Sequence, residues 1–457
     1  GFFSGAKVPK FDYTAIRPEG ALIHGFGGTS SGPGPLKELH ENLTDLYINK
    51  LGESITSVDI VDTENLIGRC VVAGNVRRSA ALAMGHHEDR QYLEMKNDQE
   101  KLYHHRWGSN NSFNAEVGMD YTWHAEQSKK NGEPGYIWLD NARTRGRFKD
   151  GERYDDLNVA GFNPCVEQQL EDAELCCLVE TFPAKHDNYE DYQRTLKIAY
   201  LYGKTITLSN THWPETNAKM LKNRRIGLSQ SGVVQAFNKH GRREMYGWCD
   251  RAYDYVQSLD EEYSNWLCIP KSVRTTSIKP SGTVSLLNGS TPGIHFPENE
   301  FYIRRIRFGK DSKLIPTLRT AGYTIEKDKY SPNTVCVEFP VQEPHYQKGK
   351  KDVSMWEQLE IAAQYQHYWA DNSVSVTITF NSTEASQLKS ALEMYETRLK
   401  AVSFLKYEET GYEQAPYEPI TKEQYEKRIK LISPIHRFDF DEGGSGSKYC
   451  TNDTCEI

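Results

Sequence analysis

The chain has 457 residues and a formal net charge of −8, with charged side chains interspersed along it, which argues against binding to a nucleic-acid backbone. It contains no apolar run of about 18 residues or more, and no basic segment followed by an apolar stretch at the N-terminus. We therefore expect a soluble cytoplasmic protein with no membrane or nucleic-acid partner, built as one large α/β domain or two to three smaller ones.

The first residues are Gly1-Phe2-Phe3 without an initiator Met, which suggests a fragment, a processed product or one piece of a split protein. Glycine and proline crowd residues 11–36, and this composition predicts an ordered, close-packed loop. Apolar residues recur at helical spacing over 36–51 and again over 188–203, so both segments are predicted to be helices. Residues 374–380 alternate apolar with hydroxyl side chains, which predicts a strand with one buried face. Interleaved helix and strand signals favour an α/β architecture.

Nine cysteines are too few and too scattered for a disulfide framework. Four of them stand alone in the sequence and are predicted to be core thiols, because free cysteine is usually buried. They are Cys70, Cys249, Cys268 and Cys336.

The segment Asn163-Pro164-Cys165-Val166-Glu167 places a thiol and a carboxylate two residues apart. If the segment is extended, as Pro164 favours, both side chains project to one side and could act on one substrate. A loop with a chance cysteine is an equally good interpretation of this motif alone. Cys176 follows eleven residues after Cys165, so a second thiol could return to the same pocket.

The run from Lys279 to Ser285, Lys-Pro-Ser-Gly-Thr-Val-Ser, leads into an apolar pair. Backbone amides and hydroxyls at a helix start can bind phosphate, and Lys279 would add positive charge. An ordinary helix cap is the alternative interpretation.

From His436 the chain becomes polar and glycine-rich, which predicts a flexible tether over 436–457. Cys450 and Cys455 lie at its end, where an exposed tail has no core for them to cross-link. Thiol–disulfide exchange needs only access and a thiolate, whereas a zinc site would want four ligands. The pair is therefore predicted to be a thiol shuttle.

Taken together, these motifs resemble the ribonucleotide reductases. Shared features are Asn-Pro-Cys-x-Glu, the second cysteine eleven residues on, Lys-Pro-Ser-Gly-Thr-Val-Ser, the segment 291–297 and the terminal cysteine pair. Segments 17–35, 70–80, 302–308 and 368–372 look like the monomeric adenosylcobalamin-dependent (class II) ribonucleoside-triphosphate reductases. No adjacent Tyr-Tyr pair, of the kind used by the di-iron class, occurs in the sequence.

The resemblance implies a ten-stranded α/β barrel of two five-stranded halves over residues 1–435, with Cys165 at the tip of a central finger loop. It implies that Cys165 becomes the thiyl radical with adenosylcobalamin as cofactor, that Glu167 is the base on the substrate 3′-hydroxyl, and that Asn163 orients the sugar hydroxyls. Cys176 would supply one reducing thiol, and Cys177, adjacent to it, would pack inside. The phosphate loop would be Ser281, Gly282, Thr283, Val284 and Ser285. Cobalamin contacts would fall within 320–443.

The same resemblance implies a ribonucleoside triphosphate substrate, a deoxynucleotide (dNTP) effector and thioredoxin or a similar dithiol as reductant. In the family, a further redox cysteine, much of the effector region and the first barrel strands lie upstream of the segment where this chain begins. Cys70 does not match that redox cysteine. A separate N-terminal polypeptide is one source of these parts, so the chain could be a partner-dependent subunit that is inactive alone. A thiol-exchange protein without nucleotide chemistry is the remaining alternative.

Overall fold

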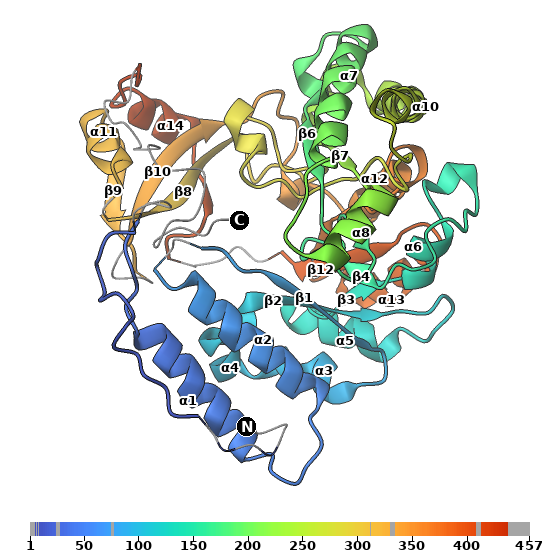
Figure 1. Cartoon of the computed structure of the whole chain (residues 1–457). Coiled ribbons are helices and arrows are strands. Elements are labelled where there is room, and N and C mark those ends of the chain that lie inside the picture. The colour runs from blue at the N-terminus through green and yellow to red at the C-terminus, as the bar shows by residue number, and fades with distance from the viewer. Residues whose placement is uncertain are drawn as a thin grey trace.

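The computed structural model describes residues 5, 7, 9–23, 28–74, 77–310, 312–329, 334–407 and 413–436. These residues form a curved sheet with helices on its outer side, and a smaller sheet lies beside it (Figure 1). No helix in the described ranges is both long and apolar enough to cross a membrane. Most of the tail, including Cys450 and Cys455, lies outside the described residues.

Two groups of parallel strands make the curved sheet. One group contains five segments in spatial order: β6 (Leu178–Thr181), β7 (Gly227–Gln230), the segment 276–278, β11 (Thr377–Phe380) with its lead-in from Val374, and β12 (Ala401–Lys406). The other contains three: β3 (Gly135–Ile137), β2 (Ser109–Asn114) and β1 (Ala81–His86). The groups meet where β12 and β3 pair antiparallel, with Ala401 opposite Ile137.

This order confirms the predicted barrel architecture in part. The described residues supply all five parallel segments of one half and three of the other. Among them, β1 pairs only with β2 and β6 pairs only with β7, so each leaves one edge without a strand partner.

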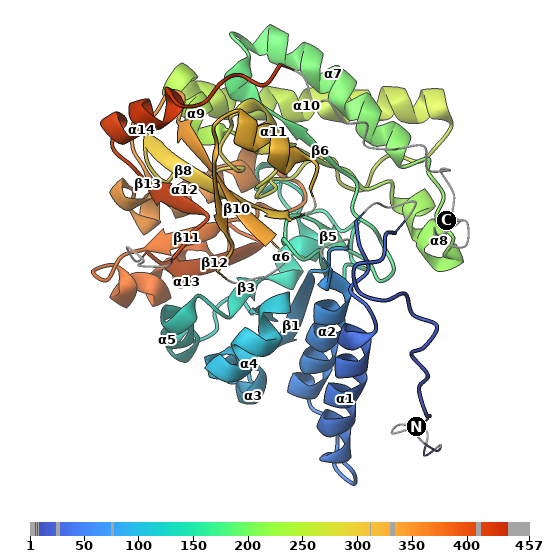
Figure 2. The same ribbon diagram turned by 90° about the vertical axis from the view of Figure 1, so that its left-hand side faces the viewer.

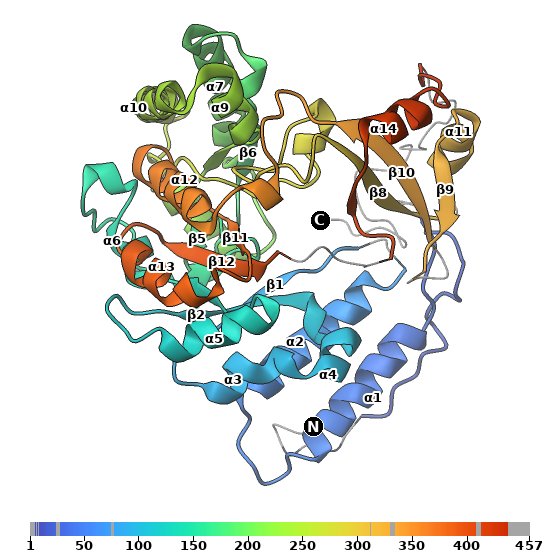
Figure 3. The ribbon, with the colours of Figure 1, turned by 180° about the vertical axis from the view of Figure 1, so that it is seen from behind.

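Helical crossovers explain why the strands of each group run parallel, because a parallel pair needs a long connection that is usually helical. One set covers the β1–β3 side: α1 (Gly34–Ile48), α2 (Ser57–Val72), α3 (Arg90–Glu94), α4 (Gln99–His104), α5 (Thr122–Asn131) and α6 (Leu139–Thr144). A second set accompanies the five-segment group: α7 (Tyr189–Ile206), α8 (Pro214–Asn223), α9 (Val233–His240), α10 (Arg242–Leu267), α12 (Met355–Tyr368) and α13 (Leu388–Tyr395). Figure 3 shows both sets from behind.

The smaller sheet is antiparallel and lies to one side (Figure 2). Its spatial order is β13 (Tyr417–Pro419), β8 (Phe301–Gly309), β10 (Thr334–Gln342) and β9 (Thr324–Lys327), with α11 (Leu314–Thr320) and α14 (Lys422–Ile429) packed beside it. Arg305 on β8 is 2.7 Å from Glu338 on β10 and also pairs with Glu418 on β13, so one cation links three strands.

The structure confirms both predicted helices, as α1 and α7, and the predicted strand around β11. The close-packed loop predicted over 11–36 is wrong in two respects. Its described residues are mostly exposed or half-buried, and α1 already begins at Gly34 because Pro35 is compatible with the first helical turn.

Among the isolated cysteines, Cys249 and Cys336 are buried as predicted. Cys268 is exposed, contrary to the prediction, at the C-terminal end of α10, where it takes the left-handed conformation (φ 54°). Cys70 is only half-buried on α2, since much of that helix faces outward.

Candidate active site

A short hairpin presents the Asn-Pro-Cys-x-Glu motif. Strands β4 (Gly161–Phe162) and β5 (Gln169–Leu170) pair antiparallel, and Cys165 stands at the turn between them. The Asn163 side chain closes the turn by accepting a hydrogen bond from the Gln168 amide at 2.9 Å. Val166 has φ 65°, a conformation that costs a β-branched residue about 1–3 kcal/mol and that persists only where its surroundings enforce it. We call residues 161–170 the finger.

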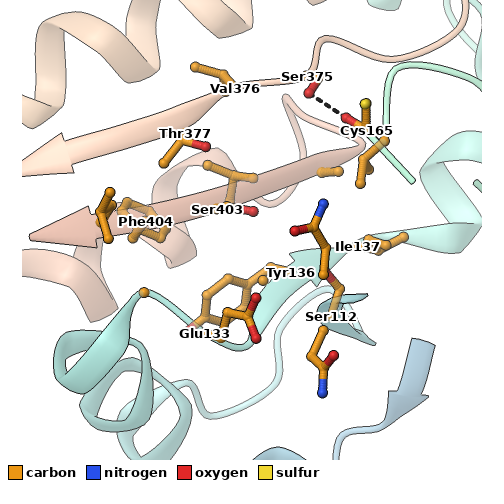
Figure 4. Close-up of a pocket in the computed structure, with 18 of the residues that line it drawn as sticks. Ser112, Glu133, Tyr136, Ile137, Cys165, Ser375, Val376, Thr377, Ser403 and Phe404 are labelled. Atoms are coloured by element: carbon orange, nitrogen blue, oxygen red, sulfur yellow. Dashed lines mark hydrogen bonds between the residues drawn. The ribbon is translucent and has the colours of Figure 1, made fainter. Parts of the chain in front are cut away.

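The barrel strands hold the finger tip from two sides. Asn110 on β2 donates a hydrogen bond to the Pro164 carbonyl at 2.8 Å, and the Ser375 hydroxyl donates one to the Cys165 carbonyl (Figure 4). The Ser373 amide bonds the Glu167 carbonyl at 3.1 Å. Residues from both strand groups therefore fix where the Cys165 thiol lies.

Burial keeps the thiols near the tip in the neutral form. Desolvation and the nearby Glu167 charge raise the pKa of Cys165, and the same causes raise the pKa of Cys176 to about 12. Cys176 is nonetheless exposed at the surface. Cys165 contributes to the electrostatic surroundings of Cys176 and raises its pKa, whereas the Asn163 side chain lowers it. The structure thus brings Asn163, Cys165, Glu167 and Cys176 together.

Cys177 points away from this group, as the alternation of an extended segment predicts. Its side chain is 3% exposed and its thiol bonds the Gly203 carbonyl at 3.4 Å. The packing role expected of Cys177 agrees with this burial.

Two carboxyl groups and one ammonium lie behind the thiols. The Glu167 side chain is fully buried and its Oε1 atom is 2.8 Å from the Lys279 ammonium, while its Oε2 atom has no hydrogen-bond partner among the described residues. Burial raises the pKa of Glu180 on β6 to about 7, against hydrogen bonds from Ser231 and Ser229 that lower it. Sequence reasoning missed Glu180, although strand alternation from Cys176 through Leu178 places it on the Cys176 side.

The predicted phosphate loop lies directly after the segment 276–278. Ser281 and Ser285 are buried, and the Ser285 amide bonds the Ser281 hydroxyl at 3.2 Å. Gly282, Thr283 and Val284 are exposed at the turn. Their backbone is open to a ligand, but the Lys279 side chain turns inward to Glu167 instead of toward this turn.

A cavity of about 290 Å³ opens beside Cys165 (Figure 4). Strands β2, β3, β11 and β12 and the finger tip form its wall, with Asn111, Ser403 and Phe404 among the side chains that line it. The Asn111 Nδ2 atom is buried without a hydrogen-bond partner in the described part of the chain. Small-molecule sites begin near roughly 300 Å³, so the cavity suits a group of about nucleoside size with at least one acceptor.

Buried charges anchor the base of the finger. The Gln169 side chain on β5 donates to Asp156 at 2.9 Å and accepts from the Lys400 ammonium at 3.2 Å. Asp156 makes two bonds of 2.8 Å to Arg225, which is also 3.0 Å from Glu174. Burial holds the pKa of Lys400 well below its usual range. We call these five residues and Arg274, which lies 3.6 Å from Asp156, the collar.

The basic members of the collar occupy equivalent places in the barrel. Arg225 directly precedes the segment that forms β7, Arg274 precedes the segment 276–278, and Lys400 precedes β12. The starts of three parallel segments of the five-segment group thus point cations at the base of the finger, where the flanking residues Asp156 and Glu174 are acidic. The collar therefore fixes the finger from below while Asn110 and Ser375 fix its tip.

Comparison with solved structures defines the class of protein. A crystal structure of a B12-dependent (class II) ribonucleotide reductase matches with TM-score 0.82 and 38% identity, over 92% of this chain and 62% of that one. The class Id ribonucleotide reductase alpha subunit of Actinobacillus ureae matches at TM-score 0.54 and 14% identity, which supports the fold alone. The fold is that of the ribonucleotide reductases.

Relatives in sequence indicate which type of ribonucleotide reductase the chain resembles. A probable adenosylcobalamin-dependent ribonucleoside-triphosphate reductase of Dictyostelium discoideum is 45% identical over 100% of this chain and 62% of its own length. That of Euglena gracilis is 45% identical over 98% of this chain and 63% of its own length. No family model matches the sequence. The chain is a homologue of the adenosylcobalamin-dependent ribonucleoside-triphosphate reductases and spans about three fifths of their length.

Proposed function

We propose that this chain carries the catalytic site of an enzyme that reduces ribonucleoside triphosphates to 2′-deoxyribonucleoside triphosphates by a thiyl-radical mechanism. The observation that carries this proposal is the geometry of the finger, which brings Cys165 and Cys176 beside the buried Glu167 carboxylate while burial raises the pKa of both thiols. A cysteine nucleophile needs a lowered pKa, whereas a hydrogen-atom relay needs a neutral S–H bond.

Each residue of the site then has one role. Cys165 gives up its hydrogen atom and, as a thiyl, removes the hydrogen from C3′ of the substrate. Glu167 accepts the proton of the 3′-hydroxyl through its unpartnered Oε2 atom. Asn163 orients the sugar hydroxyls, and the backbone of Ser281 to Ser285 receives the phosphates.

Adenosylcobalamin, when bound, supplies the radical that activates Cys165. The cavity beside Cys165 has both apolar and polar side chains in its wall, together with the unpartnered Asn111 amide, so it fits the nucleoside part of this cofactor. Asn111, Ser403 and Phe404 are the residues that would hold it. Contacts of the larger corrin ring within 320–443 stay a prediction.

Loss of the 2′-hydroxyl as water requires two electrons, so two thiols must close to a disulfide. Cys176 is one of them, and Cys177 faces the opposite way. We infer that the other thiol and the two strands that would close the barrel belong to the part of the relatives' length that this chain does not match, on the same polypeptide or on a separate one. The edges of β1 and β6 that have no strand partner among the described residues support this inference. A chain without that part would be a partner-dependent subunit.

A dNTP effector, thioredoxin as reductant of Cys450 and Cys455, and a cytoplasmic location belong to the same proposal. The test is to assay reduction of CTP with adenosylcobalamin and a small dithiol, using the chain together with the segment that completes the relatives' length. We expect deoxy-CTP in the wild type and none with Cys165→Ser. Absence of deoxynucleotide from the complete protein, or its formation by Cys165→Ser, would overturn the proposal.

A further inference from the structure

Lys279 has a partner that its motif did not predict. In the sequence it introduces the phosphate loop, but in the structure its ammonium lies 2.8 Å from the Glu167 carboxylate. Glu167 has no exposed surface on its side chain, whereas the Lys279 side chain is 29% exposed. A buried carboxylate is costly without a cation, and the Lys279 ammonium is the cation that lies against the Glu167 carboxylate at this depth.

The backbone of Lys279 is clamped on both sides. Its amide donates to the Ser229 hydroxyl at 2.9 Å. Gly293 packs against its carbonyl so closely that an added Cβ atom would lie 2.6 Å from that oxygen. Gly293 also has φ 50°, so a larger residue there would be strained as well as crowded.

Glu180 connects the two sides of this clamp. Its carboxyl accepts hydrogen bonds from the Ser231 hydroxyl and, at 3.3 Å, from the Ser229 hydroxyl. The Ser231 hydroxyl in turn accepts the Gly293 amide at 2.9 Å. The charge of Glu180 also raises the pKa of Lys279. The Asn-Pro-Cys-x-Glu motif and the segment 291–297 therefore both contact Lys279, and none of these contacts involves the exposed turn of the phosphate loop.

We propose that Lys279 is a positioning residue for Glu167, and that Glu180 and Gly293 hold it in that task. The inference rests on the proposed function and deepens it. Lys279 pairs with Oε1 and leaves Oε2 as the atom that accepts the substrate proton. In that step the 3′ O–H bond breaks, its electron pair stays with the substrate oxygen, a Glu167 O–H bond forms, and Lys279 keeps its own proton.

The competing role for Lys279 is direct binding of the substrate phosphates, and two measurements separate the roles. A phosphate ligand contributes to affinity, so Lys279→Met would weaken CTP binding by about tenfold or more, the loss expected for one charge-assisted hydrogen bond. A positioning residue contributes to turnover. We expect CTP affinity within about twofold of the wild type and a kcat lower by about 10²-fold, comparable with the loss of a positioned base.

Lys279→Arg, which keeps the charge, should recover much of that kcat. Lys271→Met is the matched control, because Lys271 lies eight positions earlier and pairs with Glu261 at 3.0 Å, where both side chains are 61% exposed. It should change neither quantity. Weakened CTP binding with unchanged kcat, or a kcat for Lys279→Met within threefold of the wild type, would overturn the proposal.

Stability measurements keep the test independent of turnover. Lys279→Met leaves the buried Glu167 carboxylate without its cation and should lower the urea midpoint. The double variant Lys279→Met with Glu167→Gln removes that carboxylate as well and should recover more than half of the lost midpoint. Additive effects of the two substitutions would also overturn the proposal. If the wild-type protein shows no reductase activity, the proposed function fails by itself, while urea midpoints and CTP binding still decide the role of Lys279.

Discussion

Replacement of Arg225 by Met should destabilise the fold through the finger anchor. Arg225 is fully buried and makes four hydrogen bonds to two buried carboxylates, at 2.8 and 2.8 Å to Asp156 and at 3.0 and 3.2 Å to Glu174. Removal of one member of a buried ion pair costs about 3–5 kcal/mol, because the remaining charge is left without a partner. With about 2.1 cal/mol/K of unfolding entropy per residue over 457 residues, that cost corresponds to a fall in Tm of roughly 3–5 °C.

The stability lost in Arg225→Met should become smaller as pH falls. In the wild type, hydrogen bonds and the charge of Arg225 outweigh desolvation and hold the pKa of Asp156 below its ordinary value. That contribution is present above the unfolded pKa and is lost as pH falls through the folded one. Without Arg225, burial pushes the Asp156 pKa upward, and protonation relieves the penalty as pH falls. The difference in stability between wild type and variant should therefore be smaller at pH 5 than at pH 8.

Urea unfolding at both pH values measures this difference. Arg251→Met is the control, since Arg251 is 51% exposed and pairs only with Glu244 at 3.2 Å among the ion pairs of the described residues, so its loss should cost about 0–1 kcal/mol. A loss for Arg225→Met no larger than for Arg251→Met at pH 8, or a difference that grows toward pH 5, would refute the reasoning.

Three further outcomes are expected. Glu167→Gln should reduce turnover by about 10²-fold or more, and a loss below about threefold would place the base elsewhere. Cys450→Ser with Cys455→Ser should block repeated turnover with thioredoxin but spare turnover with a small dithiol, whereas equal loss with both reductants would mean a structural role. Burial raises the pKa of Glu343 to about 7, so the folded protein holds this proton more tightly than the unfolded chain does. The stability that the bound proton contributes is fully present below the unfolded pKa and is lost as pH rises through 7. Glu343→Gln should therefore gain stability relative to the wild type between pH 5 and pH 8 in thermal melts, and a constant difference would contradict this.

The finger could be predicted from sequence because its information is local. Asn163, Cys165 and Glu167 share one turn, and Cys176 returns to it after a single short hairpin. The strand around β11 was equally readable, because alternation of side chains is a property of the segment itself.

The anchors of the finger could not be predicted in this way. Arg225 directly follows Arg224, and Lys400 follows Arg398 by two positions, so both resemble ordinary surface residues in the sequence. Their partners lie 69 and 231 positions away, so only the assembled barrel identifies them. The role of Lys279 was hidden for the same reason, since its partner Glu167 lies 112 positions earlier.

The order of the collar along the chain has a consequence for biosynthesis. The finger and the acidic residues on either side of it, Asp156 and Glu174, leave the ribosome before Arg225, Arg274 and Lys400, so the barrel strands can assemble around a hairpin that already exists. No segment has to be threaded through a closed ring. The contact of β3 with β12, which are more than 250 residues apart, comes last and should be slow, because distant contacts carry the largest loop-closure entropy. Until then the nascent half-barrel keeps an unpaired edge on β3, which makes late synthesis the stage most vulnerable to aggregation.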